Sequence, residues 1–485
     1  MVEQGADTAV RDRDGGHFTT CNARSWVATM ATGSDYRLAK AVGVTAIAAS
    51  AVANEYGAGI NFISVQSLGV YPAARDLVPL AMVVTGILML SKTLLFMRFS
   101  AAIPRAGSSY VWIGRSLSMP VGFVASFVNW ISFTAAMGFI AFVFTTFLAT
   151  ALGDLGVDPA PLLRPAVRFA VGLVTIWGAL ALHLAGVKTY GRLVGLLLAL
   201  NLISAATIAG FGFATAPGTF AALVGPRTGL ALAVPDTTPA TLLGFIGVCT
   251  LLVSAYAGIS AAPSLAGEAR DAARTVPRGI LLGWGIALLL YAIVTTALFH
   301  VAPWWMVEAL LRSGHSSYVT APGLVGVVAP HWISATLNLV IALVVGKTLL
   351  PQLMITSRMA FGFAEDGLFP RRLTRVSARH VPVAALVLPA VLASLFLAQS
   401  VFVAWSVGII VRSVAVLLIW FLVAASAINV RFGARFRALP WAQPLRNDRL
   451  LLGVALVSLV ITVVLAARVL VVPHTPFVFQ PMFRP

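Results

Sequence analysis

The stretch "AVANEYGAGINFIS", residues 51–64, decides how the rest of this sequence is interpreted. It belongs to an apolar run over about residues 40–66. That run is long enough to cross a bilayer, because a membrane helix needs about 20 apolar residues. The run nevertheless holds the polar residues Asn54, Glu55 and Asn61. An acid inside a membrane span is costly and is a candidate functional residue by default. This helix is therefore expected to face something other than lipid.

The same stretch contains Gly57 and Gly59, which give the backbone more freedom than a packed helix needs. Irregular backbone at membrane depth is tolerated only where it is buried in protein or lines a cavity. In transporters, such interruptions turn free N–H groups toward anions and free carbonyls toward cations. The alternative is a close helix–helix contact through small residues. Gly-x-Gly alone would favour that alternative, but the neighbouring Glu55 favours a binding site.

The composition places most of the chain in lipid. Of the 485 residues, 59% are hydrophobic and only 10% are charged, whereas soluble domains carry about 25% charged residues. The formal charge of +17 comes from 29 Arg and 4 Lys that are scattered between apolar runs. This pattern indicates membrane topology and not a phosphate-binding face. The lipid bilayer is therefore an expected partner, and nucleic acid is not.

Eleven apolar runs predict eleven membrane helices. The runs are continuous, whereas membrane strands would show short alternating segments, so an all-α integral membrane protein is expected. The connection at 304–331 is long enough to hold short helices. The runs lie at about residues 40–66, 77–98, 120–151, 166–187, 192–214, 240–265, 278–302, 332–360, 382–399, 401–428 and 450–472.

The basic residues predict the orientation of these helices. With the N-terminus inside, 23 basic residues fall on cytoplasmic connections and 6 on outer ones. Cytoplasmic loops carry the excess of Lys and Arg, so an N-terminus inside the cell is expected. An odd number of spans then places the C-terminus outside. The excess of Arg over Lys points to a bacterial plasma membrane.

A second interrupted helix is expected if the protein is built from two inverted repeats. The sixth run, "GVCTLLVSAYAGISAAPSLAGEARDAARTVPRGI" at 247–280, places Gly258 between Tyr256 and Ser260, with Pro263 shortly after. The first run begins near residue 40 and the sixth near 240, and each opens a set of five spans. Two interruptions at matching positions favour a repeat far more strongly than either does alone.

Other function classes find little support in the sequence. No Gly-x-x-x-x-Gly-Lys-Ser/Thr motif is present, so ATP is not expected as the direct energy source. The 7 histidines are dispersed, and Cys21 and Cys249 imply no disulfide framework. A membrane enzyme is thus disfavoured, and no cofactor or metal is expected. The first 38 residues are polar and lack a signal-peptide core, so a soluble tail is expected.

Four places in the chain resemble the amino acid–polyamine–organocation superfamily of permeases, over roughly residues 36–430. The last of them, a Ser-Arg … Asp-Gly-Leu-x-Pro … Pro signature after the eighth helix, is the most specific. The others correspond to the first interruption, the turn after the second helix, and the sixth interruption with its extension. In chain order, the four places read "GAGINF" (57–62), "AAIPRAGSSYVWIGRSL" (101–117), "YAGISAAPSLAGEARDAARTVPRGI" (256–280) and "SRMAFGFAEDGLFPRRLTRVSARHVP" (357–382).

The resemblance implies the leucine-transporter fold, a five-plus-five inverted repeat with discontinuous helices 1 and 6. It divides the chain into a cytoplasmic tail, a ten-helix core and a C-terminal extension with one extra helix at 450–472. The corresponding ranges are 1–38, 39–430 (repeats 39–214 and 240–428) and 431–485. The family usually has twelve helices, so one helix fewer is expected to affect assembly more than transport.

The resemblance also implies a substrate site. In the family, free amides of the first interruption hold the substrate carboxylate, here those of Ala58, Gly59 and Ile60. Carbonyls of both interruptions hold the ammonium, here those of Asn54, Glu55, Ser254 and Ala255. Tyr256 stands where the family often has an aromatic gate, with a simply packed aromatic as an equal alternative. The expected binding residues are Asn54, Glu55, Gly57, Ala58, Gly59, Ile60, Ser132, Ser254, Ala255, Tyr256, Gly258 and Gln352.

Lys347 and Thr348 are the expected coupling residues. Lys347 lies mid-span in "LVVGKTLLPQL" (343–353), where sodium-coupled relatives keep small polar residues near the first helix. A fixed ammonium there could replace a metal ion, and a buried lysine exchanges protons readily. The alternatives are an ion pair with Glu55 or a structural contact to carbonyls. The sequence also departs from the family, with Asn61 in place of Phe and Ser260 in place of an acid.

These observations predict a secondary active transporter of amino acids or related amines that works by alternating access. Proton-coupled symport is the preferred mode, and exchange by the same fold is the alternative. From another class, a nutrient sensor would use the same pocket to bind an amino acid without transport. The expected partners are a small-molecule substrate, protons and the bilayer.

Overall fold

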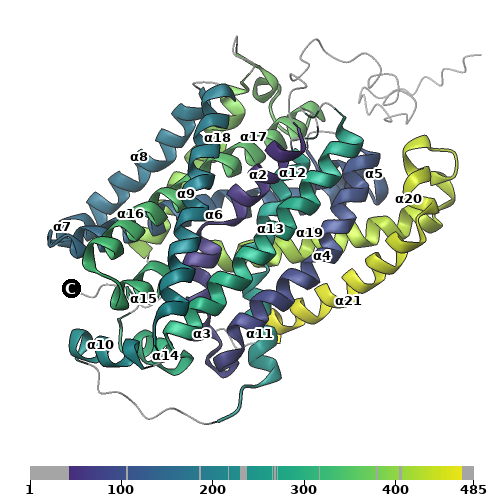
Figure 1. The fold of residues 1–485 in the computed structure, drawn as a ribbon. Coiled ribbons are helices and arrows are strands. Elements are labelled where there is room, and N and C mark those ends of the chain that lie inside the picture. Colours follow the sequence, from purple (N-terminus) through teal and green to yellow (C-terminus); the bar gives the residue numbers. More distant parts are fainter. Residues whose placement is uncertain are drawn as a thin grey trace, which may run out of the picture. The chain divides into compact units, whose positions relative to one another are not determined.

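The computed structural model describes residues 43–471, apart from short gaps at 105–106, 185–186, 217, 230–237, 265, 267–268, 270, 316, 378–380 and 404–406. The expected tail at 1–38 and the end of the chain after 471 lie outside these residues. Every regular element of the described part is a helix, which confirms the all-α prediction. Figure 1 shows long helices that run side by side, with short helices at their ends.

Nine helices of the described residues are long and apolar enough to cross a membrane, or ten if the bent pair 198–214 and 219–226 is one span. The interrupted first span occupies the remaining predicted run. The nine candidate spans contain α4 (Val78–Ala102), α6 (Met119–Asp154), α8 (Pro165–Leu184), α11 (Leu242–Leu252), α13 (Ala272–Val301), the pair α16 (His331–Lys347) and α17 (Leu349–Glu365), α18 (Val383–Ala398), α19 (Val407–Phe432) and α21 (Arg449–Val471). The bent pair belongs to α9 (Val187–Ala214) and α10 (Thr219–Thr228). The connection at 304–331 holds α14 (Trp304–Arg312) and α15 (Ala321–Val328).

The first span is interrupted at the position that its glycines predict. Helix α2 (Val44–Glu55) ends where Tyr56 adopts an extended conformation, with φ −73° and ψ 93°. The chain resumes as a short π-helix, η1 (Gly59–Ile63), and continues as α3 (Ser64–Val70). Residues 56–58 therefore lie between two half-helices that together occupy one span.

The sixth span is interrupted in a similar way. Helix α11 (Leu242–Leu252) begins at the N-cap Thr241, whose hydroxyl accepts from the amide of Gly244 at 3.0 Å. It gives way to a 3₁₀ segment, η3 (Ala255–Ser260), and then to the short α12 (Ala261–Ser264). Helices 1 and 6 are therefore both discontinuous, as the fold class requires.

The eighth span contains a break that the sequence analysis did not predict. The run expected at 332–360 forms two helices, because α16 ends at Lys347 and α17 begins at Leu349. Pro351 has no N–H to donate to the carbonyl of Lys347, four residues earlier, so the helical ladder is incomplete there. The break places Lys347 and Thr348 beside the interrupted first helix, where Thr348 lies against Gly57.

The two interruptions pack at the centre of the described bundle. Helix α2 contacts α13, α9 and η3, and α13 in turn packs on α4. Figure 1 shows α2, in purple, running beside α12 and α13. Small residues allow this close approach, because an added Cβ on Gly279 of α13 would come within 2.5 Å of the Ile47 side chain.

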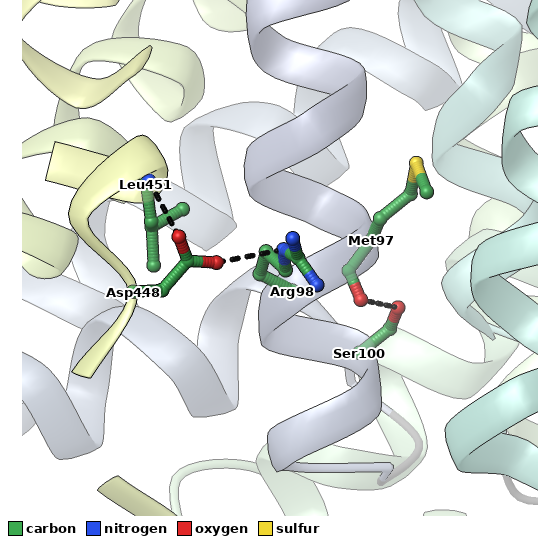
Figure 2. A network of polar contacts seen from close by, with 5 residues as sticks. All are labelled: Met97, Arg98, Ser100, Asp448 and Leu451. Carbon is green, nitrogen blue, oxygen red and sulfur yellow. Dashed lines mark hydrogen bonds and ion pairs between the residues drawn. The ribbon is translucent and has the colours of Figure 1, made fainter. Parts of the chain in front are cut away.

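The last helix, α21, lies at the edge of the bundle against α19, α4 and α11 (Figure 1). Its N-terminus is anchored by Asp448 (Figure 2). One carboxylate oxygen of Asp448 accepts from the Leu451 amide at 3.0 Å, and the other forms a 2.9 Å ion pair with Arg98 of α4. On α4, the hydroxyl of Ser100 donates to the carbonyl of Met97 at 3.1 Å. Asp448 thus caps α21 and ties it to the core.

Candidate functional site

A cavity of about 70 Å³ lies where the interruptions of the first and sixth spans meet. This volume is the space open to the centres of water molecules, and one water needs about 10–15 Å³ of it, so the cavity has room for several. Its walls come from the first interruption, from α6, from the sixth interruption, from α17 and from α19. They are formed by Asn54, Glu55, Gly57, Ala58, Gly59, Ile63, Phe133, Ala136, Phe139, Ile140, Ser254, Ala255, Ala257, Gly258, Thr348, Gln352 and Arg412.

Two hydrogen bonds join the interrupted helices beside this cavity. The Asn54 side chain donates to the carbonyl of Gly258 at 3.1 Å, and the Ile259 amide donates to Oε1 of Glu55 at 3.2 Å. Gly258 is required for this approach, since an added Cβ would lie 2.2 Å from Cγ of Glu55 and 2.6 Å from its backbone nitrogen. The polar residues of the opening stretch therefore satisfy backbone groups that the interruption of the sixth span leaves free.

Tyr291 of α13 occupies part of the expected ammonium site. Its hydroxyl lies 2.5 Å from the carbonyl oxygen of Glu55 and 3.1 Å from that of Ala255. A hydroxyl has one proton to donate, so it serves the two carbonyls in turn. Two of the four carbonyls that the resemblance assigns to the ammonium thus already have a protein donor in this structure.

Three residues of the cavity wall carry a buried side-chain oxygen that has no hydrogen-bond partner within the described part of the chain. The three oxygens are Oδ1 of Asn54, Oε2 of Glu55 and Oε1 of Gln352. Buried polar atoms normally have a partner, because leaving one unpaired costs about 1–3 kcal/mol. Three unpaired acceptors on residues that line one cavity equal in number the three N–H donors of an ammonium group.

The amides of Ala58, Gly59 and Ile60 open the second half of the first span. The first N–H groups of a helix have no acceptor inside it, and the positive end of the helix dipole lies there. Ala58 and Gly59 line the cavity, whereas the Ile60 side chain is buried in the core. An added Cβ on Gly59 would lie 2.8 Å from Cβ of Ala255, so this glycine also permits the contact between the two interruptions.

Lys347 is next to the cavity residue Thr348 in the chain but does not line the cavity itself, and it is only 4% exposed. Its ammonium donates to the carbonyl oxygens of Ala53 at 2.9 Å and Tyr56 at 3.1 Å. These carbonyls belong to the C-terminal end of α2, where a helix has unpaired acceptors and the negative end of its dipole. No ion pair joins Lys347 to Glu55 among the described residues. The hydroxyl of the neighbouring Thr348 donates to the carbonyl of Val345 at 2.6 Å.

The structure brings most of the predicted site residues together around one cavity. Four of the fourteen predicted binding and coupling residues do not line it, namely Ile60, Ser132, Tyr256 and Lys347. The Tyr256 hydroxyl donates to the carbonyl of Met82 at 3.1 Å, and its ring packs edge-to-face on Tyr291, with 4.9 Å between centroids. Tyr256 is therefore a packed aromatic in this structure. Ser132 donates to the carbonyl of Asn129 at 2.7 Å.

Sequence reasoning missed the walls contributed by α6 and α19. Phe133, Phe139 and Ile140 of α6 form an apolar wall, and Arg412 of α19 adds a buried charge. The charge itself was visible as an arginine in the middle of an apolar run, which marks a residue that faces protein or water. The apolar residues gave no signal, because they look the same whether they face lipid or a cavity.

No cluster of three or more His, Cys, Asp or Glu that could hold a metal ion occurs in the part of the chain that the structure describes. The residues that line the cavity contribute backbone amides, side-chain acceptors and one guanidinium. They are suited to reversible binding of a small zwitterion through hydrogen bonds.

Comparison with known proteins agrees with this geometry. A family model described as "Amino acid permease" matches residues 40–483. The chain is 26% identical over 349 residues to the branched-chain amino acid permease BcaP of Lactococcus lactis subsp. cremoris, a match that covers 66% of this chain and 68% of the relative. It is 27% identical over 304 residues to uncharacterized transporters of Mycobacterium bovis and Mycobacterium tuberculosis, with 61% of this chain and 61% of each relative covered.

The chain thus spans about three fifths of the length of these mycobacterial relatives. The family model, in contrast, covers nearly all of the chain that follows the N-terminal tail. With its all-helical fold, its two interrupted spans and the cavity between them, the chain belongs to the amino acid permease family of the amino acid–polyamine–organocation superfamily.

Proposed function

We propose that this protein is a secondary active transporter that carries amino acids across the membrane by alternating access. The observation that carries the proposal is the cavity between the two interrupted spans, where three lining residues each have an unpaired acceptor within the described part of the chain. The substrate ammonium binds Oδ1 of Asn54, Oε2 of Glu55 and Oε1 of Gln352. The substrate carboxylate binds the amides at Ala58, Gly59 and Ile60, where the helix dipole favours an anion.

This assignment differs from the expected one in its ammonium site. The carbonyls of Glu55 and Ala255 accept from Tyr291, and the carbonyl of Gly258 accepts from Asn54. Side-chain acceptors are therefore better placed to receive a new donor. The name of the relative in Lactococcus lactis supports an amino acid as the class of substrate.

We further propose that Lys347, together with Thr348, takes the place of a coupling metal ion and that the coupling ion is a proton. The support is the position of the ammonium, which caps the C-terminal carbonyls of α2 at the first interruption. A protonated Lys347 holds α2 in place. When it loses its proton, the contact weakens, so α2 becomes free to move relative to α16 and α17.

We propose the bacterial plasma membrane as the location, with the N-terminus in the cytoplasm. The support is the distribution of basic residues, 23 on one set of connections and 6 on the other. In the same proposal, the core covers residues 39–430, with its repeats at 39–214 and 240–428, and α21 belongs to the extension at 431–485.

Purified protein in proteoliposomes tests the proposed transport. Radiolabelled amino acids are expected to accumulate when the outside is more acidic than the inside. Counterflow without pH-driven accumulation would show exchange, which would contradict proton symport and leave transport intact. Saturable binding with neither accumulation nor counterflow would contradict transport and point to a sensor.

A matched pair of variants tests the binding site. Gln352→Met removes an acceptor from the cavity at nearly constant volume, and the KM for the substrate is expected to rise about tenfold, because a hydrogen bond to a charged group contributes about 1.5–3 kcal/mol. Gln66→Met changes a buried glutamine of α3 that does not line the cavity and whose amide donates to the carbonyl of Val319 at 2.9 Å. The KM of Gln66→Met is expected to stay within twofold of the parent. An equal KM for both variants would contradict the site.

A further inference from the structure

Arg412 is the one guanidinium that the described residues place on the cavity wall, and it is only 6% exposed. It reaches the cavity from α19, which packs against α6. Its guanidinium carbon lies 3.6 Å from the centre of the Phe133 ring. Nη1 donates to Oδ1 of Asn129 at 2.8 Å and to Oγ of Ser132 at 3.2 Å. The side chain is therefore held in a fixed orientation by three residues of α6.

These contacts fix Arg412 without neutralising it. Both hydrogen bonds come from Nη1 and end on neutral oxygens, and within the described residues no ion pair joins Arg412 to an acid. Glu55 is the only acid that this part of the chain contributes to the cavity wall, and its Oε1 already accepts from Ile259. A buried charge is strongly unfavourable unless it is paired, and a guanidinium presents a planar fork of donors that fits a carboxylate.

Arg168 is a second buried arginine that has no ion pair among the described residues, and it serves as a comparison. It is also buried, and its guanidinium also lies 3.6 Å from a phenylalanine ring of α6, that of Phe142. Its hydrogen bonds, however, come from two nitrogens and end on Thr145, Thr146 and the Phe142 carbonyl. Arg168 does not line the cavity. Arg412 differs because it lines the cavity and because only its Nη1 donates a hydrogen bond among the described residues.

The balance of buried charges points in the same direction. Among the described residues, Lys92, Lys347 and Arg412 are each at most 6% exposed, whereas Glu55 is the one acid that is buried to the same degree. A zwitterion adds no net charge to this region. A substrate with one additional negative charge lowers the excess of positive charge and provides the carboxylate that the guanidinium lacks.

We infer that Arg412 binds a carboxylate on the substrate side chain, so that acidic amino acids are the preferred substrates. This inference rests on the proposed function and adds a third contact to it. The α-carboxylate has the amides of the first interruption, the ammonium has the three acceptors, and the side-chain carboxylate has Arg412. A branched aliphatic side chain would fit the apolar wall of α6 but would leave the guanidinium unpaired.

A ligand pair of nearly equal shape tests the inference on the unaltered protein. L-Glutamate and L-glutamine differ in the charge of the side chain, and each competes against a labelled amino acid that is taken up into proteoliposomes. Glutamate is expected to compete about 30-fold more strongly, the fold-change that corresponds to about 2 kcal/mol for a buried, hydrogen-bonded charge pair. Equal competition, or uptake of leucine with no competition by glutamate or aspartate, would overturn the inference and leave the proposed transport intact. Absence of uptake and counterflow for every amino acid would overturn both.

Variants locate the effect at Arg412. Arg412→Gln is expected to lower the ratio of glutamate to leucine affinity by about 30-fold or more. The control Arg168→Gln is expected to leave that ratio unchanged. If Arg412→Gln lowers both affinities equally, Arg412 is a structural residue or binds the α-carboxylate, and the inference fails. If Arg412→Gln does not fold, Arg412→Lys keeps the charge but loses the fork, and the competition between glutamate and glutamine in the unaltered protein still decides.

Discussion

Replacing Lys347 by alanine tests whether the ammonium that caps α2 carries the coupling proton. The variant removes both contacts of Nζ, to the carbonyls of Ala53 at 2.9 Å and Tyr56 at 3.1 Å. Two carbonyls at the end of α2 then lose their donor. If water does not reach them, this costs about 1–3 kcal/mol each.

An opposing effect reduces this loss. The alanine variant no longer has to bury an ammonium, which costs several kcal/mol in the parent protein. We therefore expect a net loss of only about 1–2 kcal/mol in the free energy of unfolding. For a chain of this length, the melting temperature should fall by a few degrees at most. The variant should fold, so its transport can be measured.

The effect on coupling is expected to be much larger. In a symporter that carries one proton with each substrate, a pH difference of one unit supports about a tenfold concentration ratio, because 1.4 kcal/mol corresponds to a factor of ten. With the outside two pH units more acidic, the parent should accumulate substrate about 100-fold. Lys347→Ala should only equilibrate it, while counterflow of substrate continues. The assay is uptake of radiolabelled substrate into proteoliposomes with and without the pH gradient.

Lys347→Arg separates the coupling role from a structural one. Arginine can donate to the same carbonyls but stays protonated in proteins, so it cannot release a proton. If Lys347 carries the proton, both variants lose pH-driven accumulation. If the arginine variant accumulates substrate normally, or if the alanine variant keeps its pH response, Lys347 is only a cap of α2 and the reasoning is refuted.

Contacts around the site lead to three further predictions. Gly258→Ala should abolish uptake and lower the melting temperature, because the Cβ of the new alanine would lie 2.2 Å from Cγ of Glu55. Overpacking of this kind costs about 1–3 kcal/mol or more. A variant with normal uptake would contradict the described contact. Tyr291→Phe removes the hydroxyl on two backbone carbonyls and should destabilise the protein by about 1 kcal/mol, measured by thermal denaturation; an unchanged melting temperature would show that water replaces the hydroxyl. Asp448→Ala removes the cap of α21 and the ion pair with Arg98. The variant should be cleaved more readily by protease between α20 (Gln443–Asn447) and α21, while the KM for the substrate stays unchanged. A raised KM would contradict an anchoring role.

Much of the fold could be predicted from the sequence because lipid imposes simple rules. Continuous apolar runs indicate membrane helices, since every backbone group in lipid must be paired within its own segment. The interruptions were also visible, because an acid such as Glu55 beside a pair of glycines is costly inside an apolar run unless the helix faces a cavity or another part of the protein. The break at Thr348 was less visible, although Pro351 signals it through the missing N–H.

The candidate site was predictable only in part. Backbone positions such as Ala58 and Gly59 could be assigned because they follow from where the helix is interrupted. The ammonium contacts could not, because Tyr291 is far from Glu55 and Ala255 in the sequence and yet bonds to their carbonyls. Whether a carbonyl is free depends on which distant side chain reaches it.

By itself, then, the sequence determined the solvent of this protein, the helical type of its spans, and the places where the first and sixth helices are interrupted. These features depend on local composition and on backbone freedom. Only the tertiary structure decided which polar groups remain unpaired around the cavity and that Arg412 lies among them, whereas Arg168 does not. In the sequence, Arg412 lies in the middle of one apolar run and Arg168 lies near the start of another, but neither position shows which arginine reaches a cavity. The packing of α6 against α19 decides this for Arg412.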